Sequence, residues 1–248
     1  YRYRETSSGV CGMSVNYNSS IITNGLTMLV DAANPRSYSG SGTIWKDIVQ
    51  GLSFNSYGTT TTWGTVGGAK AFTFNGSGYW QMDSGYSNVP LGGDCTMILW
   101  LYEVGHSTRR TVFEKAGNSY ASYQQEVAMT WEVGQNISWY SRASPVYDYG
   151  GTLACDTNAW NMLAIKMSAG LTATARTGYH SKNGSAWSSN YYSNSNVALL
   201  PASQVRIGTG YAGTVDNGSV SIVACYNRML SDIEIAQNYR AWRGRFGV

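Results

Sequence analysis

Short apolar runs recur along the chain and are separated by segments rich in Gly, Ser, Thr and Asn. Within residues 160–167, Leu163, Ile165 and Met167 fall at alternate positions, the pattern of a β-strand with one buried face. Residues 95–102 are apolar at both sets of alternating positions, which is typical of a central strand covered on both sides. Further strands are expected at residues 25–31, 71–74, 111–114, 126–132, 136–140, 179–182, 205–208 and 219–226. Strands at this spacing with Gly-rich turns predict an all-β fold, a two-sheet antiparallel sandwich.

One window near the C-terminus has the pattern of an α-helix. Ser231 is a good N-cap, and Glu234 three residues later can complete a reciprocal capping box. Ile235, Tyr239 and Trp242 then fall on one face at helical spacing. The chain is therefore predicted to end in one short C-terminal helix that follows the strands of the sandwich.

Several residues are expected to build the structure rather than to carry chemistry. Asn75-Gly76 and Asn183-Gly184 are strong turn signals, whereas residues 141–157 are predicted to form a loop. The residues expected to fill the core are Trp45, Phe72, Phe74, Trp100, Trp160, Ile222 and Tyr226.

The length of 248 residues suits one large β domain. Residues 1–24 are predicted to form an extended arm that contacts a neighbouring subunit, with a disordered tail as the alternative, and residues 25–248 to form the β-sandwich domain. Four cysteines lie at positions 11, 95, 155 and 225, without a C-x-x-C pair. That spacing disfavours a zinc site, and we expect thiols rather than two disulfides.

The composition narrows the classes of partner. Only 12% of the residues are charged and the net charge is +3, so a dense basic stripe for nucleic acid is not expected. No apolar run approaches the length of a membrane span. Nineteen Tyr and nine Trp suit half-buried strands and wet interfaces, a profile typical of secreted or virion β proteins.

Several segments, taken in order, resemble the concanavalin-A-like lectin/glucanase superfamily. The matching segments are residues 25–38, 45–47, 72–79, 96–100, Trp160 with its strand, 183–184, 206–208 and 226–247. The most similar branch is the laminin-G-like domain found in many phage structural proteins, so residues 25–248 are expected to form a laminin-G-like domain. This resemblance implies a jelly roll of two curved antiparallel sheets, with the final helix across one end of the sandwich. It also implies a location in a virion, although the fold by itself does not fix function.

A glycosidase mechanism is not favoured by the acidic residues. Retaining glucanases on this fold place carboxylates at alternate positions of one strand, as Glu-x-Asp-x-Glu, and the chain has no such triplet. Glu126 and Glu132 would share a face of a straight strand but lie about 20 Å apart. His106 and His180 are expected in a loop and beside a turn, without a nucleophile motif. The chain is therefore predicted not to be an enzyme.

Calcium is the one cofactor that the sequence leaves open. Asp94, Asp216 and Asn217 lie in predicted loops, where laminin-G relatives can hold calcium at the rim of the sandwich. The alternative is that these side chains cap their own turns.

A carbohydrate site would need exposed aromatic rings together with Asn, Asp or backbone groups. The candidates lie in Ser- and Asn-rich segments that are predicted to be loops: Tyr147, Tyr149, Trp187, Tyr191, Tyr192 and Tyr211. The same residues could instead make protein–protein contacts, where Tyr and Trp are also enriched, or pack along the sheet edges.

Taken together, these patterns predict a non-catalytic virion structural protein. It would decorate a capsid or form part of a tail or fibre, bind capsid or tail subunits through its N-terminal arm, and be oligomeric or bound in a lattice. The alternative is a lectin-like adhesin that binds host surface glycans, and a glycoside hydrolase is the least favoured function.

Overall fold

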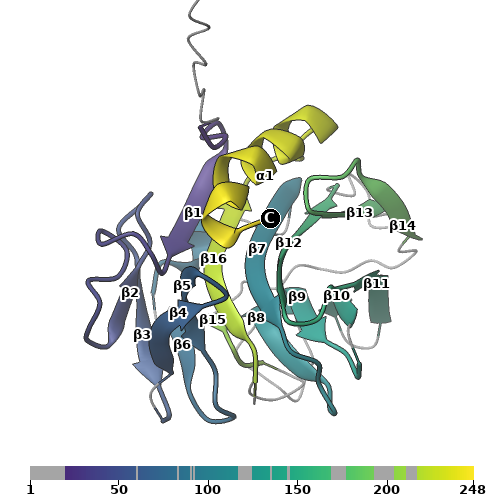
Figure 1. The fold of residues 1–248 in the computed structure, drawn as a ribbon. Helices are drawn as coiled ribbons and strands as arrows, with labels where there is room; N and C mark the ends of the chain where they lie inside the picture. The colour runs from purple at the N-terminus through teal and green to yellow at the C-terminus, as the bar shows by residue number, and fades with distance from the viewer. Residues whose placement is uncertain are drawn as a thin grey trace, which may run out of the picture.

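The computed structural model describes residues 20–59, 61–82, 84–89, 91, 93–116, 125–134, 136–143, 146–168, 177–192, 204–210 and 217–248. Two eight-stranded sheets face each other, and one helix lies against the outside of one of them (Figure 1). All the strand pairs are antiparallel. The predicted two-sheet antiparallel sandwich with one short C-terminal helix is therefore confirmed.

Sheet A has the order β14-β13-β12-β7-β16-β5-β4, and β1 also pairs with β16. Its strands are β1 (Leu26–Asp31), β4 (Thr62–Val66), β5 (Ala69–Thr73), β7 (Cys95–Glu103), β12 (Ala159–Met167), β13 (Thr177–Lys182), β14 (Ser188–Tyr192) and β16 (Ser219–Tyr226).

Sheet B has the order β11-β10-β9-β8-β15-β6-β3-β2. Its strands are β2 (Ile44–Lys46), β3 (Ser53–Tyr57), β6 (Tyr79–Met82), β8 (Arg110–Ala116), β9 (Gln125–Trp131), β10 (Asn136–Ala143), β11 (Val146–Ala154) and β15 (Gln204–Ile207). A short 3₁₀ helix, η1 (Tyr86–Asn88), precedes β7.

The main core lies between the two sheets. Trp45 of β2, Phe72 of β5 and Trp80 of β6 form an aromatic cluster, with ring centroids 4.7 Å apart for Trp45–Phe72 and for Phe72–Trp80. Phe74, which follows β5, is also buried in this core. These large rings join strands of both sheets, so the burial of their surface holds the sheets together.

A second apolar layer lies on the outer face of sheet A, under the helix α1 (Asp232–Phe246). Trp100 of β7 stacks on Phe246 and Tyr239 of the helix, with centroids 4.0 and 5.8 Å apart. Trp160, Ile222 and Tyr226 belong to the same layer. The expected position of the helix across one end of the sandwich is wrong, because these outward-facing apolar residues bind it to the face of the sheet (Figure 1).

The start of α1 has the predicted cap. The Ser231 hydroxyl accepts a hydrogen bond from the Glu234 backbone N–H, and the Glu234 carboxylate accepts one from the Ser231 N–H. Arg228 also binds that carboxylate through both terminal nitrogens, and its hydrogen bond is the main reason that the pKa of Glu234 falls to about 2. The capping box is confirmed.

The two predicted turns have the expected backbone. Asn75 accepts hydrogen bonds from two following N–H groups, and Gly76 has φ 88°. Asn183 and Gly184 both have positive φ between β13 and β14, and a Cβ on Gly184 would lie 2.6 Å from Cβ of Tyr239. The predicted loop at residues 141–157 is wrong, because β10 and β11 pair there as a hairpin.

Three cysteines lie in the described part of the chain. Cys95, Cys155 and Cys225 are buried thiols, as expected, and Cys11 lies outside the described residues. No helix among the described residues is long and apolar enough to cross a membrane. Of the predicted arm, residues 1–19 lie outside the described residues, while residues 20–24 contact α1 and β16 of the same chain.

Candidate functional site

The outer face of sheet B differs chemically from its inner face. In β6, Trp80 and Met82 point into the core, so the alternation of a strand places Tyr79 and Gln81 on the outer face. In β15, Val205 and Ile207 point inward in the same way, and Arg206 points outward. The alternation of these short strands therefore lines the outer face with polar and tyrosine side chains.

Four polar residues form a row across this face, which we call the polar row: Asn55 of β3, Gln81 of β6, Arg206 of β15 and Glu114 of β8. They are successive partners in the strand register. Arg206 donates from Nε to Gln81 Oε1 at 2.9 Å and from Nη1 to Glu114 Oε1 at 3.4 Å. Arg206 and Glu114 are 8% and 1% exposed, whereas Asn55 and Gln81 are half-buried. The buried ion pair therefore fixes the Gln81 amide at the solvent-accessible end of the row.

A pair of tyrosines lies beside that end of the polar row. Tyr57 and Tyr79 are register partners on β3 and β6, with centroids 5.5 Å apart and ring planes inclined by 13°. Tyr57 is 37% exposed and Tyr79 is half-buried, so part of the stacked pair faces solvent. Aromatic rings next to fixed amide groups are the two components that a sugar-binding surface requires.

The predicted aromatic residues near position 148 lie in β11 of the same sheet, not in a loop. The register of the polar row continues from Glu114 to Ala128 of β9, then to Tyr140 of β10 and Tyr149 of β11. Tyr147 is paired with Arg142 two positions along the same hairpin. The side chains at positions 140–150 lie outside the described residues, so only their place in the register is known.

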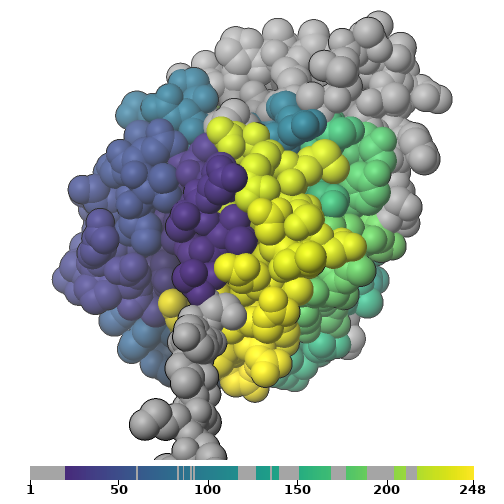
Figure 2. All heavy atoms as spheres, turned by 90° about the horizontal axis from the view of Figure 1, so that it is seen from above, coloured from purple at the N-terminus to yellow at the C-terminus, as the bar shows by residue number. Residues whose placement is uncertain are grey.

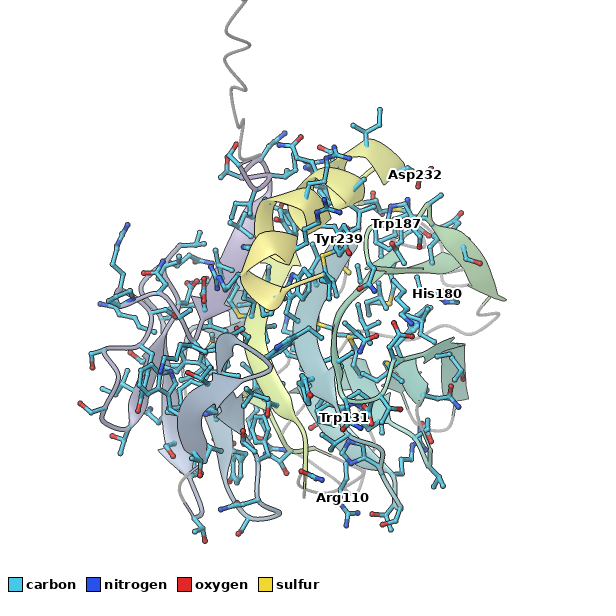
Figure 3. All side chains as sticks on the ribbon, viewed as in Figure 1. Arg110, Trp131, His180, Trp187, Asp232 and Tyr239 are labelled. Atoms are coloured by element: carbon cyan, nitrogen blue, oxygen red, sulfur yellow. The ribbon has the colours of Figure 1, made fainter. Side chains whose placement is uncertain are left out.

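The other predicted aromatic residues belong to sheet A or lie outside the described residues. Tyr191 and Tyr192 are in β14, again a strand rather than a loop, and Tyr211 is outside the described residues. Trp187 is half-buried near the start of α1, where its backbone N–H donates to Asp232 Oδ1 at 3.0 Å and the Lys166 ammonium lies 4.6 Å from its ring (Figure 3). β11, with Tyr147 and Tyr149, contacts β14, with Tyr191 and Tyr192, where the edges of the two sheets meet, and Trp187 directly precedes β14.

The residues of the candidate site were missed by the sequence analysis. The only available signal was the alternation in Tyr79-Trp80-Gln81-Met82 and in the segment that contains Asn55 and Tyr57. That alternation separates two faces, but it does not tell which face is buried.

A second group of polar residues is buried near Trp131, far from α1 (Figure 3). Glu103 ends β7 and is fully buried, and its Oε1 accepts a hydrogen bond from Gly105 N–H at 2.6 Å. The same oxygen lies 3.6 Å from Nε2 of His106, whose ring stacks on Trp131 at 4.6 Å. Burial raises the pKa of Glu103 to about 7. A raised carboxyl pKa is common in active sites, but here no sugar can reach the carboxyl in this conformation.

Both histidines, which were expected in a loop and beside a turn, are buried. His106 is 5% exposed, and His180 of β13 is 8% exposed. Burial lowers the pKa of His180. Glu132 lies just beyond β9, where it pairs with Arg109 at 2.9 Å and binds the Ser138 hydroxyl.

The three calcium candidates are not gathered into a site within the described part of the chain. There, no group of three or more His, Cys, Asp or Glu side chains is placed to hold a metal. Asp94 is exposed, and the side-chain Oδ1 of Asn217 accepts a hydrogen bond from Gly218 N–H, as in a self-capped turn. Asp216 lies outside the described residues, so calcium stays a prediction.

Comparison with known proteins gives likeness of fold only. No protein-family model matches this chain, and no curated protein sequence matches it. Among solved structures, the Trypanosoma rangeli sialidase matches with a TM-score of 0.62 at 13% identity, over 91% of this chain and 34% of the sialidase. This chain thus spans about a third of the length of that enzyme.

Two further matches cover more of the other chain. Domain 4 of AbnA, a GH43 extracellular arabinanase from Geobacillus stearothermophilus in complex with arabinotriose, has a TM-score of 0.62 at 15% identity, over 86% of this chain and 98% of that domain. The binding domain of botulinum neurotoxin DC in complex with SialylT has a TM-score of 0.66 at 8% identity, over 88% of this chain and 51% of that chain. The fold is therefore a β-sandwich that is found in glycosidase and lectin-like chains.

These matches correct the predicted role. The prediction of a virion structural protein is wrong, because the similar structures are mainly glycoside hydrolases together with a toxin binding domain. The prediction that the chain is not an enzyme is wrong on the same finding, since sialidase and arabinanase chains carry this fold. The predicted location in a virion is not tested by these structures and stays a prediction.

Proposed function

We propose that this chain is a glycan-binding domain of a carbohydrate-active protein, and that the Tyr57–Tyr79 pair beside the polar row is its binding face. The observation that carries the proposal is the stacked pair of Tyr57, which is 37% exposed, and half-buried Tyr79, next to the Gln81 amide that a buried ion pair fixes. Matched structures in complex with arabinotriose and with SialylT support an oligosaccharide as the ligand class.

The chemistry of the face suits a sugar. Aromatic rings cover the C–H faces of a pyranose or furanose, and the amides of Asn55 and Gln81 can bind its hydroxyl groups. Arg206 binds Gln81 before any ligand arrives, so little side-chain entropy is lost on binding. Pairing with Glu114 compensates the charge of Arg206, which favours neutral sugar residues at this position.

The ordered motifs of residues 25–247 favour the laminin-G-like branch of the concanavalin-A-like superfamily. A glycan on a host surface, bound in the manner of an adhesin, is the ligand source that we favour.

The test is a glycan array probed with the chain, followed by calorimetry with the best oligosaccharide. Tyr57→Ala and Tyr79→Ala should each lower the affinity at least tenfold, because each removes part of the stacking surface. Tyr179→Ala serves as the matched control, since Tyr179 lies on sheet A beside Lys166. It should leave the affinity unchanged.

Two results would contradict the proposal. One is the absence of any bound glycan on an array that includes arabinan and sialylated oligosaccharides. The other is a bound glycan whose affinity is the same for the wild type, Tyr57→Ala and Tyr79→Ala, with all three proteins folded. The second result would move the site away from this face.

A further inference from the structure

The outer face of sheet B continues beyond the polar row to the strand β2 at the end of the sheet (Figure 1). Trp45 of β2 points into the core, so the alternation of the strand places Ile44 and Lys46 on the outer face. Ile44 is the register partner of Asn55, and Lys46 is the register partner of Ser53. The face that carries the tyrosine pair therefore ends in an apolar residue and a cation at the sheet edge.

Both of these side chains are open to solvent. Ile44 is 51% exposed, and Lys46 is also exposed. Within the described ranges, Lys46 forms no ion pair. The acidic residue next to it in the chain, Asp47, is 0% exposed, and its carboxylate accepts hydrogen bonds from three backbone N–H groups. The charge of Lys46 is therefore not neutralised by this neighbour.

A second cation lies near the same edge. Lys46 N–H donates to Ser37 C=O at 2.8 Å, and the Ser37 hydroxyl donates to Lys46 C=O at 2.6 Å, so the segment that contains Ser37 runs beside β2. Arg36, one residue earlier, is exposed and forms no ion pair with another described residue. The edge therefore carries positive charge, whereas the charges of Arg206 and Glu114 in the polar row compensate each other.

The spacing along the face sets the size of a ligand that reaches both ends. Ser53 precedes Tyr57 by four residues in β3, and Lys46 lies one strand further out. At about 3.3 Å per residue and about 4.8 Å between strands, the backbone at Lys46 is about 14 Å from that at Tyr57. This span exceeds one sugar ring, so only an oligosaccharide can contact both residues.

We propose that Lys46 binds the carboxylate of an acidic sugar residue, in an oligosaccharide whose neutral residues stack on Tyr57 and Tyr79. This inference rests on the glycan-binding function proposed above and names the class of glycan. Ile44, between the two ends of the face, offers an apolar contact to the C–H groups of the connecting sugar. The carboxylates of a sialic acid and of a uronic acid present the same chemistry to an ammonium group, so both belong to the proposed class.

The contact should act mainly on the choice between charged and neutral ligands. An exposed ammonium–carboxylate pair adds little to affinity and is screened by salt. It nevertheless selects an acidic ligand over a neutral ligand of the same shape.

The test compares oligosaccharides that differ only in charge. The probes are sialyllactose with its methyl ester, and trigalacturonate with its methyl ester, measured by calorimetry at low and high salt. The wild type should bind at least one acid about three- to fivefold more tightly than its ester at low salt, the range of an exposed charge pair. Lys46→Gln should bind that acid and its ester equally, and Lys46→Arg should keep the preference. High salt should reduce the preference of the wild type.

Arg240→Gln is the matched control, because it removes the same charge from an exposed position. Arg240 belongs to α1, which lies beside β1 in Figure 2, with the segments that follow β1 on the far side of that strand. This variant should keep the preference of the wild type. Circular dichroism should show that all the variants are folded.

The outcomes separate this inference from the proposed function. A preference within one pair of probes identifies the acidic sugar as a sialic or a uronic acid. If acids and esters bind equally to the wild type while Tyr57→Ala weakens both, the glycan-binding face stands and the role of Lys46 is overturned. An equal loss of preference in Lys46→Gln and Arg240→Gln overturns it as well, since net charge would then explain the effect. If no glycan binds, both proposals fail.

Discussion

The outer faces of the two sheets have opposite chemistry. On sheet A, Trp100, Met162 and Ile222 point outward and α1 covers them. On sheet B, Asn55, Gln81 and Arg206 point outward in the polar row, with two tyrosines beside them.

The difference follows from the strand sequences. The strand β7 of sheet A is buried at eight of its nine positions, and its sequence is apolar on both faces except at Thr96, Tyr102 and Glu103. A strand of sheet B such as β6 alternates half-buried and buried residues. The absence of alternation in β7 therefore matches a strand that is covered on both faces, and the alternation in β6 matches a strand with one half-buried face.

The largest loss of stability is expected when the ring that α1 stacks on is removed. Trp100→Ala should lower the free energy of unfolding by about 3–5 kcal/mol, because the indole is fully buried between Phe246 and Tyr239. Urea unfolding followed by circular dichroism measures the change. Tyr79→Ala, the same kind of truncation on the outer face of sheet B, should cost much less. Equal losses for the two variants would remove the distinction between the faces.

Glu103 is buried at the end of β7, and its titration tests how completely this end of the strand is shielded from solvent. The pKa of Glu103 is raised from 4.5 to about 7 in the folded protein, with burial as the main cause. Folding therefore favours the protonated carboxyl. The contribution of Glu103 to stability is complete below about pH 4.5, falls as the pH rises toward 7, and is lost above that value. The difference between the folded and unfolded pKa values corresponds to about 3 kcal/mol of unfolding free energy.

Glu103→Gln removes this titration without removing the shape of the side chain. The variant should gain stability relative to the wild type between pH 5 and pH 8, as measured by urea midpoints at both values. A difference between the two proteins that is the same at pH 5 and pH 8 would show that Glu103 does not titrate in this range.

The sequence predicted the fold better than the site, for physical reasons. Apolar runs and the Ser231–Glu234 box are local signals, and each is enough to define its element. The position of α1 on the face of sheet A depends on which sheet Trp100 joins, and that is decided by long-range pairing of β7 with β12 and β16. The tyrosine pair depends in the same way on the contact between β3 and β6, which are separated by strands of the other sheet.

Loss of the helix cap should lower the stability by less than loss of Trp100, although α1 covers the same face. Ser231→Ala should cost about 1 kcal/mol, because the Glu234 backbone N–H loses its side-chain acceptor. The thermal midpoint of the variant should fall, and Ser231→Asp, which can also cap, should restore most of the loss. An unchanged midpoint for Ser231→Ala would mean that the contact of Arg228 with Glu234 alone holds the start of α1.

The smallest effect on stability is expected on the outer face of sheet B. Tyr57→Ala should change the free energy of unfolding by only about 0.5 kcal/mol, since the side chain is partly exposed and loses mainly its stacking on Tyr79. The proposed loss of glycan affinity would then occur in a protein as stable as the wild type. A cost near that of Trp100→Ala would instead mean that this face is packed as firmly as the face under α1, and the tyrosine pair would have to be interpreted as core rather than as a binding surface.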